Sequence, residues 1–316
     1  MPAHSILDAI GNTPLVELRR VVPAGSARIV AKLESANPTR SMKDRLARAI
    51  VQGAVAKGLL SPGGTIVEYT AGTTGVSLAF VARALGYKAH FVYSDAFSEE
   101  KGRTMRAFGA DITDVPSPDR KISKDLVNAM IAKASEISTR QAHWFSDQLK
   151  NEDGAAGYAD LGEELWRQTE GRIDAFVHAV STGHSLHGTG RALRRYKGDL
   201  RVVAVEPSES AVLSGGPAGS HQIEGIGVGF LPPLWSRAEV DEILTVSTAE
   251  AKAMARRLAE EEAIFAGTST GANVVAALRL AERLGSGATV ATLIVDSGLR
   301  YLSTDVFGRS GAGASA

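Results

Sequence analysis

The chain alternates short apolar runs with longer segments in which apolar residues recur every three or four positions. The short runs are rich in β-branched residues and are bounded by Gly, Pro, Asp or Ser, which is typical of buried parallel strands. They predict strands at residues 27–33, 65–69, 89–93, 110–115, 174–180, 201–205 and 288–295. Strands that alternate with helices favour parallel sheets covered on both faces, so the predicted fold class is α/β and doubly wound.

The longer segments show the period of amphipathic helices. Their apolar faces are Leu78, Val81, Ala82 and Leu85 in one segment, and Ala251, Met254, Ala255 and Leu258 in another. Ser247 and Glu250 are spaced as a capping box, which predicts the start of the second helix. Gly109 is expected to end a helix that contains Met105 and Phe108, because a left-handed residue is needed there.

Length and composition limit the possible domain organisation of the chain. The chain has 316 residues, with 44% hydrophobic and 22% charged, as in ordinary globular proteins. At roughly 100–200 residues per domain, this length predicts two domains or one large α/β unit. The polar run at residues 150–154 interrupts the pattern and marks a candidate boundary.

The charge balance excludes several classes of partner. Basic and acidic side chains number 35 each, so there is no electrostatic reason to expect binding to nucleic acid or to an anionic membrane. Cysteine is absent, which excludes disulfides, cysteine-ligated zinc and iron–sulfur clusters. No secretory signal and no run of about 18 apolar residues is visible, so we expect a cytoplasmic protein without a membrane span.

The loops that follow strands are the candidates for chemistry, since ligands of doubly wound folds bind at the carboxyl ends of strands. The first is residues 37–45, where Lys43 stands at the mouth of a predicted helix. Its amine can form a Schiff base with an aldehyde if burial lowers its pKa. On this loop alone, a solvated surface lysine is the favoured interpretation.

Two loops of small residues open helices and offer anion sites. Residues 70–75 present backbone N–H groups and hydroxyls that suit a substrate carboxylate, or form a simple capped turn. Residues 181–190 let the backbone approach a phosphate, or form a bare turn. His184 and His187 in that loop are either anion donors or partly exposed loop side chains. Thr189 stands in place of the lysine of a Walker loop, so that motif is excluded.

Two further segments are weaker signals. Residues 267–272 open another helix and by themselves indicate only a capped helix start. The glycine-rich run at residues 225–229 is either a closing segment or an ordinary loop. In combination, however, these loops on an α/β background form a strong pattern.

That pattern resembles the cysteine synthase/cystathionine β-synthase family of pyridoxal phosphate enzymes. Four segments carry the resemblance, in the family's order over residues 5–305: Ile10–Val16, Asn37–Arg45, His221–Phe230 and Asp296–Thr304. The resemblance implies the tryptophan synthase β-like fold, called fold type II. In that fold, pyridoxal 5'-phosphate lies in the cleft between two α/β domains with mainly parallel sheets.

The resemblance also implies roles for individual residues. Lys43 would hold the cofactor as an internal aldimine and later act as the general base at Cα. The expected cofactor-binding residues are Lys43, Thr73, Ser181, Thr182, Gly183, His184, Ser185 and Ser269. The expected substrate-binding residues are Thr70, Ala71, Gly72, Thr73, Thr74 and Gly225. No metal site is expected.

A domain division follows from the same resemblance. Residues 1–40 and 151–305 would form a larger cofactor-binding domain, residues 41–150 a smaller mobile domain with the carboxylate loop, and residues 306–316 a flexible tail. The partners implied are a small amino-acid substrate and a second copy of the chain in a homodimer.

The reaction implied is β-replacement on an O-activated serine through an aminoacrylate intermediate. A neutral hydroxyl at Ser269 would not keep the pyridine nitrogen firmly protonated, which favours loss of a β-substituent over transamination. The default is cysteine synthase, from O-acetylserine and sulfide, or a related β-substituted alanine synthase. The alternatives are a serine/threonine dehydratase and a catalytically impaired, cofactor-binding regulatory homologue.

Several positions depart from the family pattern and bear on the substrate. Ala71 and Thr73 replace a serine and an asparagine of the carboxylate loop, and Arg40 replaces a glycine. Arg40 is either a contact for a second acid or a surface arginine. Residues 144–150 stand where the family has a substrate-binding glutamine and an Asn/Pro-rich run, and Glu224 stands where glutamine is common.

Overall fold

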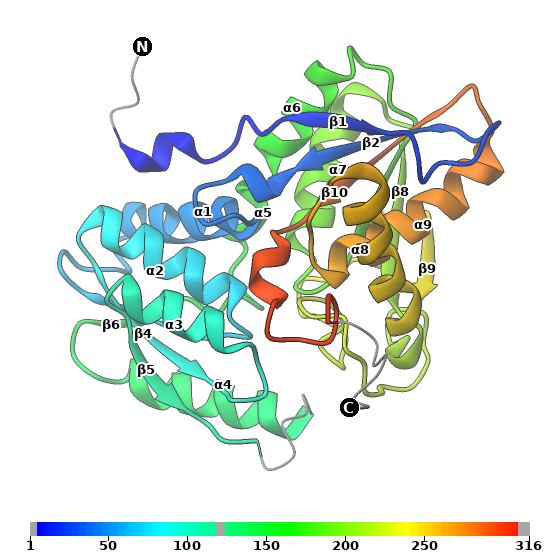
Figure 1. The fold of residues 1–316 in the computed structure, drawn as a ribbon. Helices are drawn as coiled ribbons and strands as arrows, with labels where there is room; N and C mark the ends of the chain where they lie inside the picture. The colour runs from blue at the N-terminus through cyan, green and yellow to red at the C-terminus, as the bar shows by residue number, and fades with distance from the viewer. Residues whose placement is uncertain (1–4, 118–123, 309–316) are drawn as a thin grey trace, which may run out of the picture.

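The computed structural model describes residues 5–117 and 124–308, which form two β-sheets in separate lobes (Figure 1). The larger sheet has the strand order β1-β2-β10-β7-β8-β9, and the smaller has the order β5-β4-β3-β6. Among these strands only β1 and β2 pair antiparallel, which confirms the predicted α/β class with mainly parallel sheets. The strands are β1 Leu15–Leu18, β2 Arg28–Leu33, β3 Thr65–Tyr69, β4 Lys88–Tyr93, β5 Asp111–Asp114, β6 His143–Phe145, β7 Ala175–Ala179, β8 Arg201–Pro207, β9 Glu242–Val246 and β10 Thr289–Ile294.

All the predicted strands are present, with ends that differ by at most 2 residues from the prediction. The prediction missed β1, β6 and β9. β6 has only 3 residues, and β9 is an edge strand whose first four positions are half-buried, so neither forms a clear apolar run. β1 is the antiparallel edge of its sheet and is equally short of buried positions.

The helices confirm the predicted helix ends. Ser247 and Glu250 form the capping box at the start of α8, and Gly109, just after α3, has a left-handed φ of 84°. The helices are α1 Lys43–Ala56, α2 Thr73–Leu85, α3 Glu99–Ala107, α4 Lys124–Ser138, α5 Asp153–Ala156, α6 Ala159–Gln168, α7 His184–Tyr196, α8 Thr248–Glu262 and α9 Thr268–Leu284.

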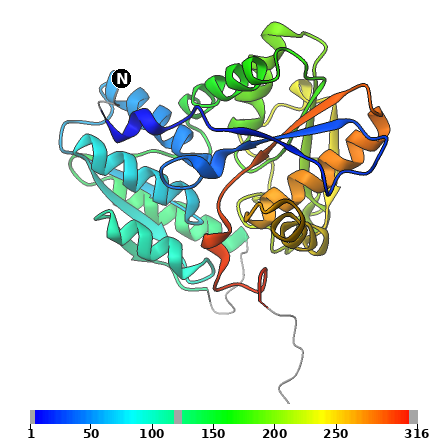
Figure 2. The ribbon, with the colours of Figure 1, turned by 45° about the horizontal axis from the view of Figure 1, so that its top comes forward.

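Alternate residues of the larger sheet face opposite cores. In β7, Phe176 packs with α6 and α7, whereas the next residue, Val177, packs with α8 and α9. Figure 2 shows these two pairs of helices on opposite sides of the strands. Both side chains are fully buried, and burial of a side chain of this size contributes about 1.5–3 kcal/mol to stability.

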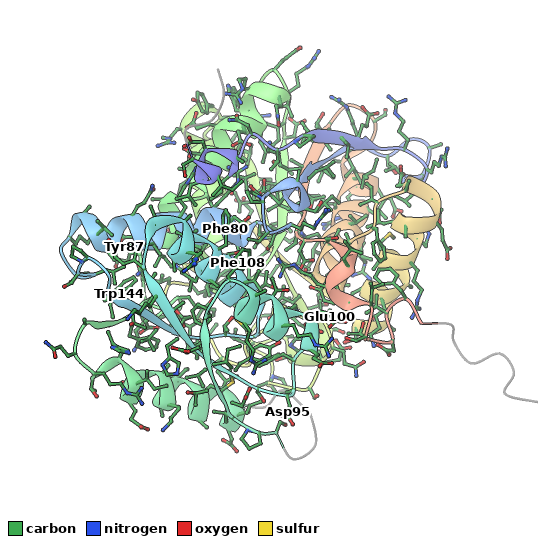
Figure 3. All side chains as sticks on the ribbon, turned by 60° about the vertical axis from the view of Figure 1, so that its left-hand side comes forward. Phe80, Tyr87, Asp95, Glu100, Phe108 and Trp144 are labelled. Carbon is green, nitrogen blue, oxygen red and sulfur yellow. The ribbon has the colours of Figure 1, made fainter. Side chains whose placement is uncertain are left out.

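The smaller sheet is also covered on both faces. Side chains of α2 and α3 pack on one face and those of α4 on the other. Phe80 of α2 and Phe108 lie side by side on the first face, with ring centroids 5.9 Å apart (Figure 3). Helix α1 belongs to both lobes, because Leu46 packs in the core of the larger sheet and Ala47 in that of the smaller. The first residue of α1 therefore lies at the junction of the two lobes.

Some predictions on chain organisation remain untested. Residues 1–4, in the segment inspected for a secretory signal, and residues 309–316 of the predicted tail lie outside the described residues. No helix formed by the described residues is long and apolar enough to span a bilayer. The division into a larger and a smaller mobile domain stays a prediction, although the strands of each sheet come from the expected ranges.

A buried ion network fixes the start of α1. The Arg45 guanidinium donates to Glu34 Oε2 and to Glu164 Oε1, each at 2.8 Å, and Lys32 Nζ lies 2.6 Å from Glu164 Oε2. Burial alone would raise the pKa of Glu164, but the hydrogen bonds and charges of Arg45 and Lys32 outweigh it and lower that pKa to about 2. The network ties α1 to the end of β2 and to α6.

Replacing Arg45 with Met tests this network. The substitution leaves Glu34 buried without its cation, so we expect the free energy of unfolding to fall by about 3–5 kcal/mol. The matched control is Arg103→Met, because Arg103 forms only an exposed pair with Glu99; this change should cost less than about 1 kcal/mol. Urea unfolding measures both variants, and equal losses would contradict the role given to the network.

Candidate active site

The loops after the strands of both sheets border a cavity of about 380 Å³, and a smaller recess opens beside it. Lys43, Thr73, Ser181 and Gly225 line both spaces. The predicted site residues on these walls are Lys43, Thr70, Ala71, Thr73, Thr74, Ser181, Thr182, Ser185, Gly225 and Ser269. Three other predicted residues, Gly72, Gly183 and His184, belong to the same loops but do not line either space.

Lys43 is the first residue of α1 and is only 7% exposed, which overturns the surface interpretation. The loop before it is fixed to the end of β10, because the Met42 N–H donates to Val295 O at 3.0 Å and Ser41 bridges to Asp296. Burial lowers the pKa of Lys43 to about 8, against a smaller opposing effect of the Asp296 charge. The amine is therefore neutral, and nucleophilic, at a far lower pH than an exposed lysine.

The start of α7 presents hydrogen-bond donors to the recess. Gly183 precedes it with a φ of 93°, which brings the chain into the helix. His178 of β7 accepts at Nδ1 from the Asn273 amide at 3.2 Å, so its Nε2–H donates to Ser185 Oγ at 2.8 Å. The hydroxyl hydrogen of Ser185 is then free to point into the recess. Backbone N–H groups and a free hydroxyl at a helix N-terminus can bind a phosphate.

Burial favours the neutral form of the His178 imidazole, which links Asn273 to Ser185 by hydrogen bonds. It lowers the pKa of His178 to about 3, and the nearby charge of Lys43 acts in the same direction. Sequence analysis missed both His178 and Asn273, because a histidine in an apolar strand and an asparagine in a buried helix show no distinguishing pattern. Their placement is visible only once β7 and α9 are packed together.

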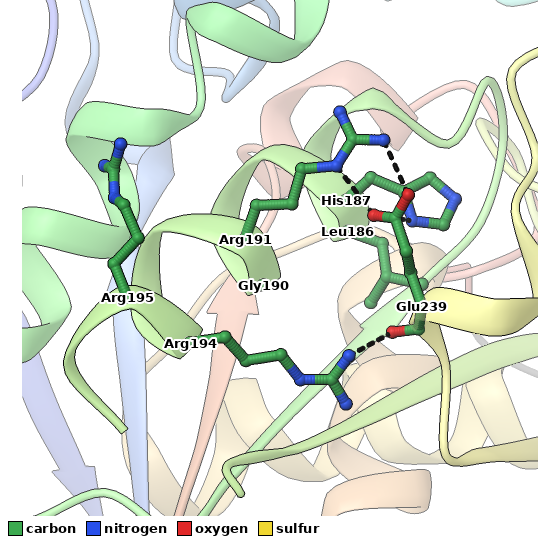
Figure 4. A pocket seen from close by; sticks show the side chains of 7 residues that line it. All are labelled: Leu186, His187, Gly190, Arg191, Arg194, Arg195 and Glu239. Carbon is green, nitrogen blue, oxygen red and sulfur yellow. Dashed lines mark hydrogen bonds and ion pairs between the residues drawn. The ribbon is translucent and has the colours of Figure 1, made fainter. Parts of the chain in front are cut away.

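The two histidines of the same loop are not anion donors to the cavity. His184 Nε2 donates to Asn151 O at 2.8 Å, so its Nδ1 accepts from Thr182 Oγ1 at 2.7 Å. His187 points to another surface depression, beside Glu239 and Arg191 (Figure 4). The ring of His184 is therefore not available to a phosphate, but its backbone N–H at the start of α7 remains a candidate contact.

The loop at residues 70–74 is shaped by its own hydroxyls. Thr70 Oγ1 accepts from the N–H groups of Gly72 at 2.9 Å and Gly75 at 3.0 Å, which folds the loop over the start of α2. Thr74 Oγ1 donates to Gln148 Oε1 at 2.8 Å, and Gln148 Nε2 donates to Tyr69 O at 3.0 Å. Gln148 lines the cavity, so residues 144–150, which stand where the family has a substrate-binding glutamine, also place a glutamine side chain on the wall.

The recess also contains a carboxyl group that sequence analysis missed. Ser269 lies at the start of α9 and is 3% exposed, and Asp296 is 1% exposed on the same wall. Tyr301 donates to Asp296 Oδ2 at 2.8 Å, while Oδ1 is buried with no hydrogen-bond partner among the described residues. Burial raises the pKa of Asp296. The charge of Arg300 is the largest of the effects that oppose this rise. Asp296 begins one of the segments that carried the family resemblance, and its place directly after a strand was the available signal.

Comparisons with known proteins place the chain in a family. A profile described as "Pyridoxal-phosphate dependent enzyme" matches residues 6–296. A cysteine synthase of Staphylococcus aureus (strain Mu50 / ATCC 700699) is 40% identical over 308 residues, which cover 97% of each chain. The crystal structure of a cysteine synthase (OASS) from Entamoeba histolytica superposes with a TM-score of 0.91 at 35% identity, covering 99% of this chain and 93% of that one. An O-ureido-L-serine synthase gives a TM-score of 0.92 at 38% identity, covering 99% and 98%.

The chain belongs to the family of pyridoxal-phosphate dependent enzymes, and within it to the cysteine synthase-like enzymes of fold type II. The predicted family, the enzyme class and the cofactor pyridoxal 5'-phosphate are thereby confirmed. The residues present fit this cofactor: a buried amine suits its aldehyde, the start of α7 with Ser185 suits its phosphate, and Ser269 in the recess suits its ring nitrogen. The roles of the individual residues stay predictions.

The lowered pKa of Lys43 predicts how cofactor uptake depends on pH. Only the neutral amine attacks an aldehyde, so the uptake rate of the cofactor-free protein should rise with pH to a plateau, with a midpoint near the pKa of about 8. Stopped-flow absorbance with added pyridoxal phosphate measures that rate. A midpoint near 10.5, the ordinary value for lysine, would contradict the burial of this amine.

Proposed function

We propose that the enzyme replaces the β-substituent of an O-activated L-serine, with O-acetyl-L-serine and sulfide as the default substrates and cysteine as the product. The observation that carries the proposal is the buried Lys43 amine on the wall of a cavity that also holds the loop at residues 70–74. The similarity to cysteine synthases supports this donor and product, and related β-substituted alanines are the variants of the same reaction.

Different residues of the chain would bind the cofactor, transfer the proton and bind the substrate carboxylate. When bound, pyridoxal phosphate supplies an electron sink for negative charge at the substrate Cα. Lys43 would hold the cofactor aldehyde and, when the substrate amine has taken that place, move the proton at Cα. The backbone N–H groups of Thr73 and Thr74, at the start of α2, would hold the substrate carboxylate, with Ala71 and Gly72 leaving room for it. Thr73 and Gly225 line both the cavity and the recess and would contact cofactor and substrate together.

The recess favours elimination of the β-substituent. Ser269 would offer the ring nitrogen a neutral hydroxyl, which would not hold a proton there as a fixed carboxylate would. Asp296 shares the recess, but burial raises its pKa and so favours its neutral form. The ring would then stabilise negative charge at the substrate Cα less, and loss of the β-substituent would compete well with transamination.

The charges on the wall select the leaving group. Among the described wall residues, the lysines are Lys43 and Lys101, and Lys101 is paired with Glu224. His221 has both ring nitrogens engaged, one with Gly227 O and one with the Ile223 N–H.

Arg40 lines a separate depression with Arg300 and not this cavity, so it is not placed to meet a second acid here. The described wall residues therefore offer no uncommitted cation to a phosphate group, which favours an uncharged ester of serine, such as the acetate ester, over a phosphate ester as the donor.

The role of Lys43 is tested by its replacement with Ala. The variant should take up no cofactor covalently and lose at least about a hundredfold in turnover of O-acetylserine, because proton transfer at Cα is lost as well. Lys57→Ala is the control, since Lys57 is an exposed lysine that pairs with Asp153. Absorbance spectra and product assays measure both variants. A Lys43→Ala protein that keeps the cofactor colour and full activity would refute the proposal.

The donor preference is tested with two esters of serine. O-phosphoserine brings about two negative charges that find no cation, so its kcat/KM should be at least about thirtyfold below that of O-acetylserine. Product formation with sulfide measures both, and a preference for the phosphate ester would contradict the charge argument. Release of a 2-oxo acid without any nucleophile would instead identify a dehydratase, and no turnover of any O-activated serine would identify an impaired, regulatory homologue.

The proposed assembly rests on the family resemblance. We propose a cytoplasmic homodimer that acts on small amino-acid substrates. Light scattering should then give twice the chain mass of 33.1 kDa.

A further inference from the structure

An ion pair crosses the cavity between the two lobes. Lys101 lies in α3, which packs on the smaller sheet, and its Nζ pairs with Glu224 Oε2 in the segment that follows β8 of the larger sheet. The Lys101 side chain is 2% exposed and that of Glu224 is 20% exposed. Lys101 lines the large cavity and Glu224 lines the recess, so the pair stands where the two spaces meet.

The stem of Lys101 also fixes the loop at residues 70–74. A Cβ added to Gly72 would lie 2.4 Å from Lys101 Cδ, so only glycine leaves room for the stem. Gly72 has a φ of 113°, which independently requires glycine. Lys101 Nζ lies 4.9 Å from the centroid of the Tyr301 ring, a favourable place for a cation. Lys101 therefore contacts the loop at residues 70–74 on one side and the larger lobe on the other.

Glu224 carries the connection onward to the cofactor recess. Its backbone N–H donates to Thr268 Oγ1 at 3.2 Å, and Thr268 is the residue before Ser269 at the start of α9. A buried lysine without its acid would leave a charge with poor solvation, so each partner depends on the other. The pair thus joins the segment that would hold the substrate carboxylate to the segment that would face the cofactor ring.

We propose that Lys101 and Glu224 are positioning residues that set the affinity for the amino-acid donor. They do so by holding the loop at residues 70–74, which would bind the substrate carboxylate, at a fixed position relative to the recess. This inference rests on the proposed function. Neither side chain is needed for proton transfer, so their loss acts on donor binding and not on the chemical step. The order of residues 221–229 depends on the same pair, whether or not the donor is bound.

A double-mutant cycle in the cofactor-loaded enzyme tests the proposal. Lys101→Met and Glu224→Gln should each raise KM for O-acetylserine about tenfold with kcat changed less than threefold, and the double variant should be no worse than either single one. The control cycle uses Glu99→Gln and Arg103→Met, an exposed pair on the same helix, and should leave KM within about twofold. Additive losses near a hundredfold, or a loss in kcat alone, would overturn the proposal.

Hydrogen exchange without donor gives a readout that does not depend on activity. In the loaded enzyme, amides of residues 221–229 should exchange at least about tenfold faster in Lys101→Met and Glu224→Gln than in wild type, with no change in the control variants. Unchanged exchange in both variants would overturn the proposal. If wild type turned over no O-activated serine, the proposed function would fail, while the exchange experiment would still decide whether the pair orders this segment.

Discussion

The Lys43 amine is kept out of water at the residue where α1 begins, and this placement depends on both sheets. The loop before it is bound to the end of β10, and the helix behind it packs with one face in each hydrophobic core. The buried Arg45 network anchors the same turn to β2 and α6. A lysine on an ordinary surface helix would stay charged; here the packing of two lobes makes a neutral amine available.

Burial moves most of the titratable groups around the cavity toward their neutral forms. It lowers the pKa of His178 to about 3 and that of His184 to about 4, and it raises the pKa of Asp296. The hydrogen bonds of the two histidines are therefore directional contacts between neutral groups, which orient Ser185 and Thr182 without adding charge. The Lys101–Glu224 ion pair stands at the boundary of the cavity. Fixed neutral donors around one reactive amine suit a cofactor that brings its own phosphate charge.

The apolar runs predicted the buried strands well, because a strand covered on both faces must be apolar along its length. Edge strands such as β9 lack that requirement and escaped prediction. Lys43 and the helix-opening loops were predictable because chemistry at strand ends needs particular residue types there. The roles of His178 and Asn273 were not, because they act through contacts between residues 95 positions apart. The direction in which His187 points was equally hidden, since a loop sequence does not say which side of a helix start a ring will pack on.

The central claim is that one particular amine captures the cofactor. Reduction of the loaded protein with borohydride makes that bond permanent, and mass spectrometry of its peptides then locates it. The account predicts a pyridoxyl group on Lys43 alone. A group on Lys101, the other lysine of the cavity wall, or a protein that carries none, would contradict it.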